Sequence, residues 1–245
     1  IQSWQSALPV NAPNRFIINI KKNQVATVST FIKQISAEAN PQLFAMIRGR
    51  LVEKNGHPVN AEMFNDERAK RLVAREFNLS SAAVMQADNQ LLQGRWWRSD
   101  EAAAPLLSIE QDIANTLNIK LGDTLTYDIA GSKITLNVTS IRKVEWDSMR
   151  ANFFAVTPSE TLAKFNASYM TAFYLPNRQD VALNRLVQQF PNFTVIDVAS
   201  IMNQVRDIMS KLSIAVSFVF GFCVLASIVA VSYTHLRAHE TKANL

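Results

Sequence analysis

Histidines are the residues of this 245-residue chain best suited to acid–base or metal chemistry, and there are three of them. His57 follows Asn55-Gly56, a dipeptide typical of turns, so we expect it in a solvated loop. His235 and His239 are four residues apart, a spacing that can place two imidazoles on one helix face. Their order differs from the H-E-x-x-H of metalloproteases, and no third ligand is evident. The histidines therefore predict neither a catalytic base nor a metal site.

Acidic and aromatic motifs give little more support for catalysis. Glycosidases need two carboxylates that face each other across a sugar, whereas neighbours along a strand point to opposite faces. We therefore expect the close acidic pairs of this chain on solvated faces and at helix N-termini. The pairs are Asp66-Glu67, Asp100-Glu101, Glu110-Asp112 and Glu145-Asp147. The run Arg95-Trp96-Trp97-Arg98 could stack on a ligand ring, but aromatic packing across a hairpin is the favoured interpretation.

Composition excludes several classes of protein. Glycine occurs only six times, and both G-x-G-x-x-G and G-x-x-x-x-G-K-[ST] are absent, so we expect no dinucleotide cofactor and no ATP hydrolysis by this chain. The G-x-S-x-G motif of serine hydrolases is also absent. The single cysteine, Cys223, has no partner for a disulfide within the chain. The net charge of +5 arises from mixed signs, which argues against a nucleic-acid surface.

One apolar stretch, Leu212 to Val231, runs for twenty residues without a charge. As a helix it would measure about 30 Å, the thickness of a bilayer core. We expect the helix to begin at Val198 and to continue unbroken into this span, because no proline follows Pro191. Its apolar positions alternate spacings of four and three, which predicts a heptad seam on a stiff stalk. The seam residues are Ile201, Val205, Ile208 and Leu212.

The residues before this helix predict a mixed α+β fold. A β-α-β unit is expected at each end, and a hairpin-rich block is expected between the two units, which together suggest a ferredoxin-like layer with an insertion. The first unit comprises strand Arg15–Ile20, a helix capped by Asn23, and strand Leu43–Gly56; the second comprises strand Tyr169–Leu175, helix Val181–Phe190 and strand Phe193–Ile196. Between them we expect helices at Asp66–Phe77 and Ser108–Leu117, strands at Thr124–Ile129 and Lys133–Val144, and a short helix capped by Thr157 or Ser159.

Several longer runs carry a resemblance to a known family. They are NAPNRFIINI (Asn11–Ile20), RLVAREFNLS (Arg71–Ser80), GRWW (Gly94–Trp97), KLGDTLTYDIAG (Lys120–Gly131) and VEWDSMRANFF (Val144–Phe154). Over roughly residues 1 to 231 the chain resembles the large extracytoplasmic domain of bacterial FtsX-like ABC transporter permeases, and within them the YbbP-like branch. The resemblance implies a MacB-type periplasmic core domain, with a ferredoxin-like porter lobe and an inserted β-rich lobe.

On this basis we expect five segments. Residues 1–85 form the first part of the porter lobe, 86–178 the inserted β-rich lobe, 179–211 the second part of the porter lobe with the stalk, and 212–231 the transmembrane helix. Residues 232–245 do not resemble the family and read as a non-native tail. The family also has a membrane helix before this domain and further helices after it, which are not expected within this sequence.

The resemblance further implies a non-catalytic permease subunit in the bacterial inner membrane, with residues 1–211 in the periplasm. Its implied partners are a separate ABC ATPase, a second permease copy and membrane lipid, and its cargo would be a lipid, lipoprotein or peptide. The alternative is a single-span, membrane-anchored extracytoplasmic enzyme such as an envelope hydrolase. The absence of a recognisable nucleophile–base constellation weighs against that alternative.

Overall fold

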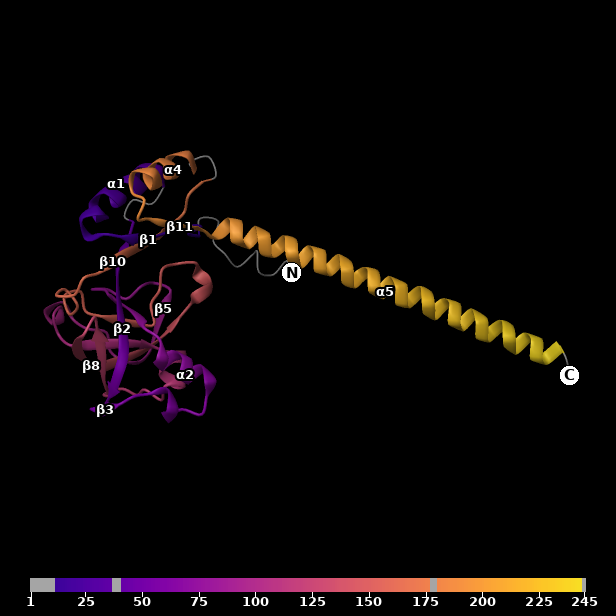
Figure 1. The fold of residues 1–245 in the computed structure, drawn as a ribbon, viewed down its shortest axis with the longest axis horizontal. Coiled ribbons are helices and arrows are strands. Elements are labelled where there is room, and N and C mark those ends of the chain that lie inside the picture. The colour runs from indigo at the N-terminus through magenta and orange to yellow at the C-terminus, as the bar shows by residue number, and fades with distance from the viewer. Residues whose placement is uncertain (1–11, 37–40, 177–179, 244–245) are drawn as a thin grey trace. The chain divides into compact units, whose positions relative to one another are not determined.

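The computed structural model describes residues 12–36, 41–176 and 180–243 (Figure 1). The chain divides into two compact units, Ile1–Ile196 and Asp197–Leu245. The first unit is mixed α+β and the second is one long helix. The prediction of a mixed α+β fold followed by one long apolar helix is therefore confirmed.

The first unit contains four α-helices and eleven strands among the described residues. The helices are α1 (Val25–Ile35), α2 (Glu67–Ala74), α3 (Gln111–Thr116) and α4 (Asp180–Gln189). The strands are β1 (Arg15–Ile20), β2 (Leu43–Lys54), β3 (His57–Pro58), β4 (Phe77–Ser81), β5 (Asn89–Gly94), β6 (Leu106–Glu110), β7 (Thr124–Ile129), β8 (Ser132–Val144), β9 (Ala155–Thr157), β10 (Ser168–Phe173) and β11 (Thr194–Asp197).

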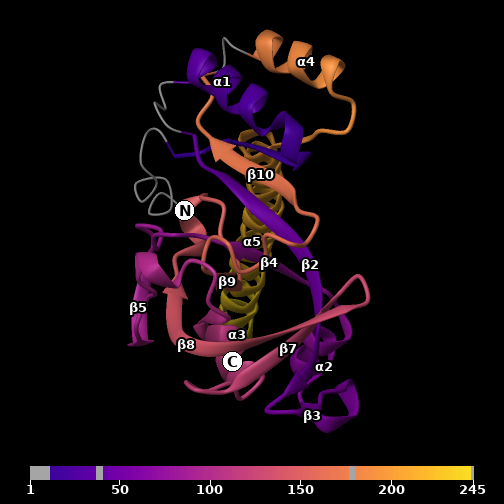
Figure 2. The ribbon, with the colours of Figure 1, turned by 90° about the vertical axis from the view of Figure 1, so that its left-hand side faces the viewer.

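A small lobe is built from the two ends of this unit. Its strands lie in the order β11-β1-β10-β2, and β1 and β2 both run antiparallel to β10. Strands β1 and β2 are thus parallel and are joined by α1, as predicted for the first β-α-β unit. Helices α1 and α4 lie on one side of the sheet (Figure 2). The core beneath them contains Ile17, Ile20, Val28, Ile32, Phe173, Leu175, Leu183, Leu186 and Phe193.

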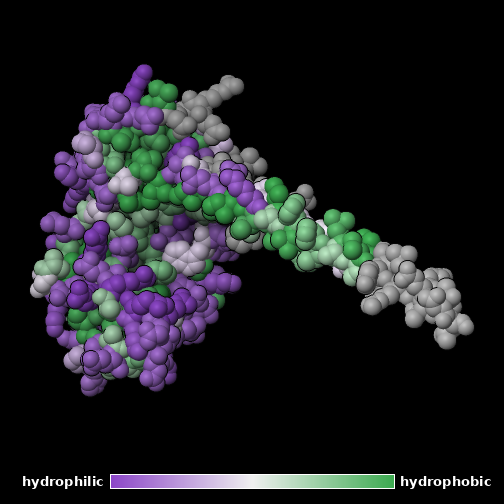
Figure 3. Space-filling model, turned by 45° about the vertical axis from the view of Figure 1, so that its right-hand side comes forward, coloured by the Kyte–Doolittle hydropathy of each residue, from purple (hydrophilic) through white to green (hydrophobic). Residues whose placement is uncertain are grey.

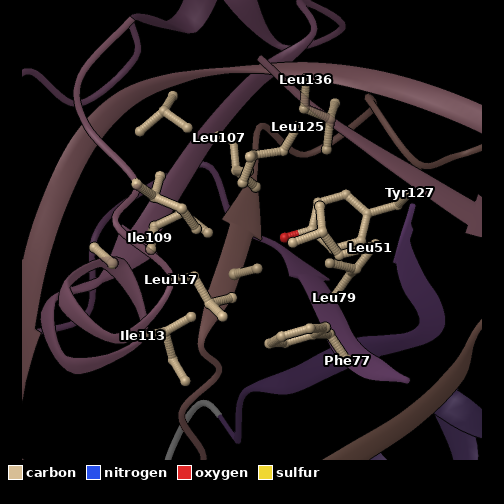
Figure 4. Close-up of a cluster of buried hydrophobic side chains, with 14 of the residues drawn as sticks. Leu51, Phe77, Leu79, Leu107, Ile109, Ile113, Leu117, Leu125, Tyr127 and Leu136 are labelled. Carbon is tan, nitrogen blue, oxygen red and sulfur yellow. The ribbon is translucent and has the colours of Figure 1, made fainter. Parts of the chain in front are cut away.

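A larger lobe occupies the middle of the sequence, and β2 runs through both lobes. Leu43 to Met46 pair with β10 in the small lobe, and the following residues of β2 pair with β4 and β7. The sheet continues in the order β4-β9-β6-β8-β5. Its core takes side chains from Ile47 to Leu162, so it includes residues on both sides of the predicted boundary between 85 and 86 (Figure 4).

Some local predictions are wrong. The segment predicted as a helix from Ser108 to Leu117 is instead strand β6 followed by α3. Leu107, Ser108 and Ile109 are almost fully buried and pair with β8 and β9, so tertiary pairing overrides the helical interpretation. Glu110 ends the strand and caps the helix with its own carboxylate.

Two helix boundaries and one short helix are also corrected. Asn23 was expected to cap α1, but it lies within a 3₁₀ turn. Helix α1 begins at Val25, directly after Gln24, and its N-terminus has no side-chain cap. Helix α2 ends at Ala74, because Phe77 is buried in the larger core as the first residue of β4. The expected short helix after Thr157 is a series of turns.

Candidate functional site

The second unit consists of helix α5 (Val198–Ala243), which begins at the predicted residue. Asp197 precedes it, and its Oδ1 accepts a hydrogen bond from Ser200 N at 2.9 Å, as an N-cap does. The helix has 46 residues and would therefore be about 69 Å long. It contains no proline, so every backbone N–H beyond the first turn has an intrahelical acceptor available.

The middle of α5 is long and apolar enough to cross a membrane. The candidate span is Asp207–Val231, 25 residues with mean hydropathy 2.7, and none of its window is buried inside the protein. A core helix of this composition would be covered by other elements. Full exposure of such side chains to water is unfavourable, which favours a lipid environment. Figure 3 shows this stretch as a continuous apolar surface.

The predicted seam residues all lie on α5. Ile201, Val205, Ile208 and Leu212 are between 46 and 57% exposed, so their side chains are accessible to a partner helix. No contact of the described residues identifies a packing partner for these four side chains. The seam therefore stays a prediction.

Of the three histidines, only His57 has a side chain that the structure describes. His57 is an exposed residue of the β2–β3 hairpin, opposite Lys54, as its sequence context predicts. His235 and His239 lie on α5, where their side chains fall outside the described ones. Among the residues that the structure describes, no group of three His, Cys, Asp or Glu side chains is placed to hold a metal ion.

Two acidic pairs serve as helix caps, as the sequence suggests. Asp66 Oδ1 accepts from Arg68 N at 2.9 Å at the start of α2. Glu110 is buried and accepts from Asp112 N and Ile113 N, both at 3.0 Å, at the start of α3. These carboxylates are held by backbone donors and are not paired across a cleft for acid–base chemistry.

The Arg95–Arg98 motif is structural. Trp97 is buried, Trp96 is half-buried, and their ring centroids are 3.8 Å apart. Arg95 forms a two-point ion pair with Glu101, at 2.6 and 2.7 Å. The hydrogen bond from Arg95, with a further one from the backbone of Arg98, lowers the pKa of Glu101 to about 2. The arginines are thus engaged with acids, and aromatic packing is the outcome that the sequence favoured.

Sequence reasoning missed a buried arginine, Arg142 on β8, which is 1% exposed. Its Nη2 donates to Phe153 O, whereas Nη1 has no hydrogen-bond partner among the described residues. Burial lowers the pKa of Arg142 to about 10, and the carboxylates of Glu110 and Asp88 oppose that shift. Asp88 in turn accepts from Ser148 Oγ at 2.6 Å. Residue types alone gave no signal for this cluster, since it assembles from two strands, β6 and β8, and from loops that are distant in sequence.

An α+β unit followed by a helix able to span a bilayer, with its acidic groups used as caps and ion pairs, is the architecture of a membrane-associated protein. Comparison with known proteins makes the class specific. The chain is 33% identical over 208 residues to the "Uncharacterized ABC transporter permease YbbP" of Escherichia coli (strain K12). The resemblance to ABC transporter permeases of the YbbP branch is therefore confirmed. Permeases are non-enzymatic subunits, and the envelope-hydrolase alternative finds no support.

The match covers 84% of this chain and 24% of that permease, so the chain spans about a quarter of its relative's length. No family model matches the chain. A crystallised domain from Porphyromonas gingivalis, named for a permease protein, has a TM-score of 0.40 and 11% identity, covering 76% of this chain and 91% of that domain. A likeness at that level is too weak to support an argument.

Proposed function

We propose that this chain is part of an ABC transporter permease that carries ATP-driven motion from a separate ATPase to an extracytoplasmic domain. In this proposal residues 1–211 lie in the periplasm, 212–231 cross the inner membrane, and the moving domain exports or extracts a lipid, lipoprotein or peptide. The single observation that carries the proposal is the 33% identity to a permease over most of the chain.

The fold supports a finer assignment. We interpret the small lobe as a ferredoxin-like porter lobe of MacB type, because its order β11-β1-β10-β2 places the two β-α-β units in that arrangement. The larger lobe is then the inserted β-rich lobe. We keep the division at 85/86 and 178/179 as part of the proposal, together with residues 232–245 as a non-native tail.

The stalk is the coupling element in this proposal. An unbroken helix is the stiffest element that a chain offers, and α5 runs from the end of β11 through the candidate span. The seam of Ile201, Val205, Ile208 and Leu212 would pack against another stalk helix in a permease homodimer, with membrane lipid around the span.

Topology is the first test. A reporter active only in the periplasm, fused after Ser200 in the full-length gene, should be active, and a reporter active only in the cytoplasm should be silent. The reverse pattern would contradict the proposed orientation.

Coupling is tested by two matched proline variants. Val205→Pro should remove a backbone hydrogen bond inside α5, at a cost of about 3 kcal/mol or more, and abolish complementation of a deletion strain at matched expression. Ala199→Pro is the control, because it lies in the first turn where the N–H has no intrahelical acceptor. Full complementation by Val205→Pro would mean that the helix is only a tether.

A further inference from the structure

The small lobe has helices on one face of its sheet and apolar side chains on the other. In the strand register Phe16 lies opposite Ala172, and Met170 lies opposite Phe44. All four are half-buried. Their alternating neighbour Ile17 points into the core under the helices, so these side chains face the opposite way.

This face continues into a second aromatic cluster. Trp97, Phe153 and Val156 are buried there, and half-buried Trp96 and Met46 pack against them. Phe44 and Met170 pack against the same cluster, and the rings of Phe44 and Phe153 are 6.0 Å apart. We call the combined patch the apolar surface; it consists of Phe16, Phe44, Met46, Trp96, Met170 and Ala172.

Three polar side chains beside the apolar surface already have hydrogen-bond partners within the chain. Trp96 Nε1 donates to Ala83 O at 3.1 Å, and Trp97 Nε1 donates to Ala82 O at 2.8 Å. Ser168, which lies opposite Met46, donates through Oγ to Met46 O at 3.3 Å. A peptide partner would bring its own backbone donors and acceptors, and these would find few partners here. A hydrocarbon chain carries no such cost.

An exposed cation, Arg48, lies at the end of this surface. Arg48 follows Met46 by two residues on the same face of β2 and is exposed. Its cross-strand neighbour is the uncharged Asn78, and within the described residues the guanidinium makes no hydrogen bond or ion pair. Arg50, the next cation on this face, is the cross-strand neighbour of Asp128, but no ion pair joins their side chains. From Phe44 to Arg48 the strand advances by about 13 Å.

We propose that the apolar surface binds a long-chain fatty acid, with the hydrocarbon across the surface and the carboxylate on Arg48. The exposed guanidinium of Arg48 can hold a monoanionic carboxylate by two parallel hydrogen bonds. The proposal rests on the permease function, for which it names the cargo class.

The test measures binding of tritiated palmitate to the full chain in lipid nanodiscs, with empty nanodiscs subtracted. Arg48→Gln should weaken palmitate binding roughly tenfold, because hydrogen bonds to a charged group are lost. Arg50→Gln is the matched control and should change it less than about twofold, because Arg50 lies two residues further along β2, roughly 7 Å beyond Arg48. Hexadecanol, which lacks the charge, should bind the wild-type chain and Arg48→Gln equally.

A third variant tests the hydrocarbon part. Phe16→Ser, with folding checked by circular dichroism, should weaken palmitate and hexadecanol alike. The proposal is overturned if Arg48→Gln binds palmitate as the wild type does, or if hexadecyltrimethylammonium binds as tightly as palmitate. The proposal is also overturned if Phe16→Ser dissociates a homodimer of the chain while palmitate binding is unchanged, because the apolar surface would then bind a second copy of the chain. The assay involves neither ATPase nor transport, so its failure leaves the topology and proline tests of the permease proposal unaffected.

Discussion

The carboxylate of Glu110 is predicted to stabilise the larger lobe in two ways that can be separated. It caps α3 through two backbone N–H groups at 3.0 Å, and it lies beside the buried Arg142 in the parallel pairing of β6 and β8. Loss of a cap costs about 1 kcal/mol. Opposite charges on directly paired residues of neighbouring strands, at roughly 6 Å and an effective dielectric constant of about 20, attract by about 3 kcal/mol. Glu110→Ala should therefore lower the free energy of unfolding by about 4 kcal/mol.

Asp66→Ala provides the matched control. Asp66 also caps a helix, through Arg68 N at 2.9 Å, but it is exposed and has no buried arginine beside it. Its replacement should cost only the cap, about 1 kcal/mol. Urea unfolding of the full chain in a nonionic detergent, followed by tryptophan fluorescence, measures both values, because Trp97 is buried in the first unit.

A double-mutant cycle identifies the cause of the difference. In an Arg142→Met background the charge that Glu110 compensates is gone, so Glu110→Ala should then cost only about 1 kcal/mol. The coupling energy between the two positions should thus be about 3 kcal/mol. If Glu110→Ala costs the same in both backgrounds, or no more than Asp66→Ala, the buried charge pair contributes nothing and the reasoning is refuted.

Three further predictions concern single positions or the whole chain. In the same urea assay, Gly94→Ala should destabilise the first unit more than Gly122→Ala. Both glycines have positive φ, but a Cβ added at Gly94 would lie 2.1 Å from Thr139 O, whereas a Cβ added at Gly122 would have no atom within 4 Å. Glu101→Gln should lower the thermal unfolding temperature at neutral pH and lose that effect near pH 2. The folded pKa of about 2 is below the usual glutamate pKa of 4.5, so the carboxylate's stabilisation is complete above pH 4.5 and disappears as the pH falls through 2. The purified chain alone should show no ATP turnover in a phosphate-release assay, and turnover at stoichiometric yield would contradict the permease assignment.

Local pattern was sufficient for much of the architecture. The absence of proline after Pro191 was enough to predict an unbroken α5 from Val198, and twenty residues without charge located the candidate span. The Asn55-Gly56 and Ala130-Gly131 turns form as expected, with positive φ at all four residues. These features depend on residues within a few positions of each other, so a one-dimensional pattern contains the necessary information.

Non-local pairing decided the rest. Ser108 to Glu110 have helix-compatible neighbours, yet they become a strand because β8 and β9 flank them and bury them. Periodicity reports that a side chain is buried, but not which distant strand lies beside it. The boundary of the larger core, from Ile47 to Leu162, was likewise set by β2 passing through both lobes.

The two sites that carry the most testable chemistry needed the tertiary structure. Arg142 gathers Glu110 and Asp88 from separate segments, and the apolar surface joins β1, β2, β10 and the Trp96 segment. In both cases the strand register determines which side chains share a face, and a shift of one residue would turn each of them to the other side. The sequence by itself determined the class of protein and its candidate span, whereas the register of the folded sheet decided which of its charges are buried together and which lie beside the apolar surface.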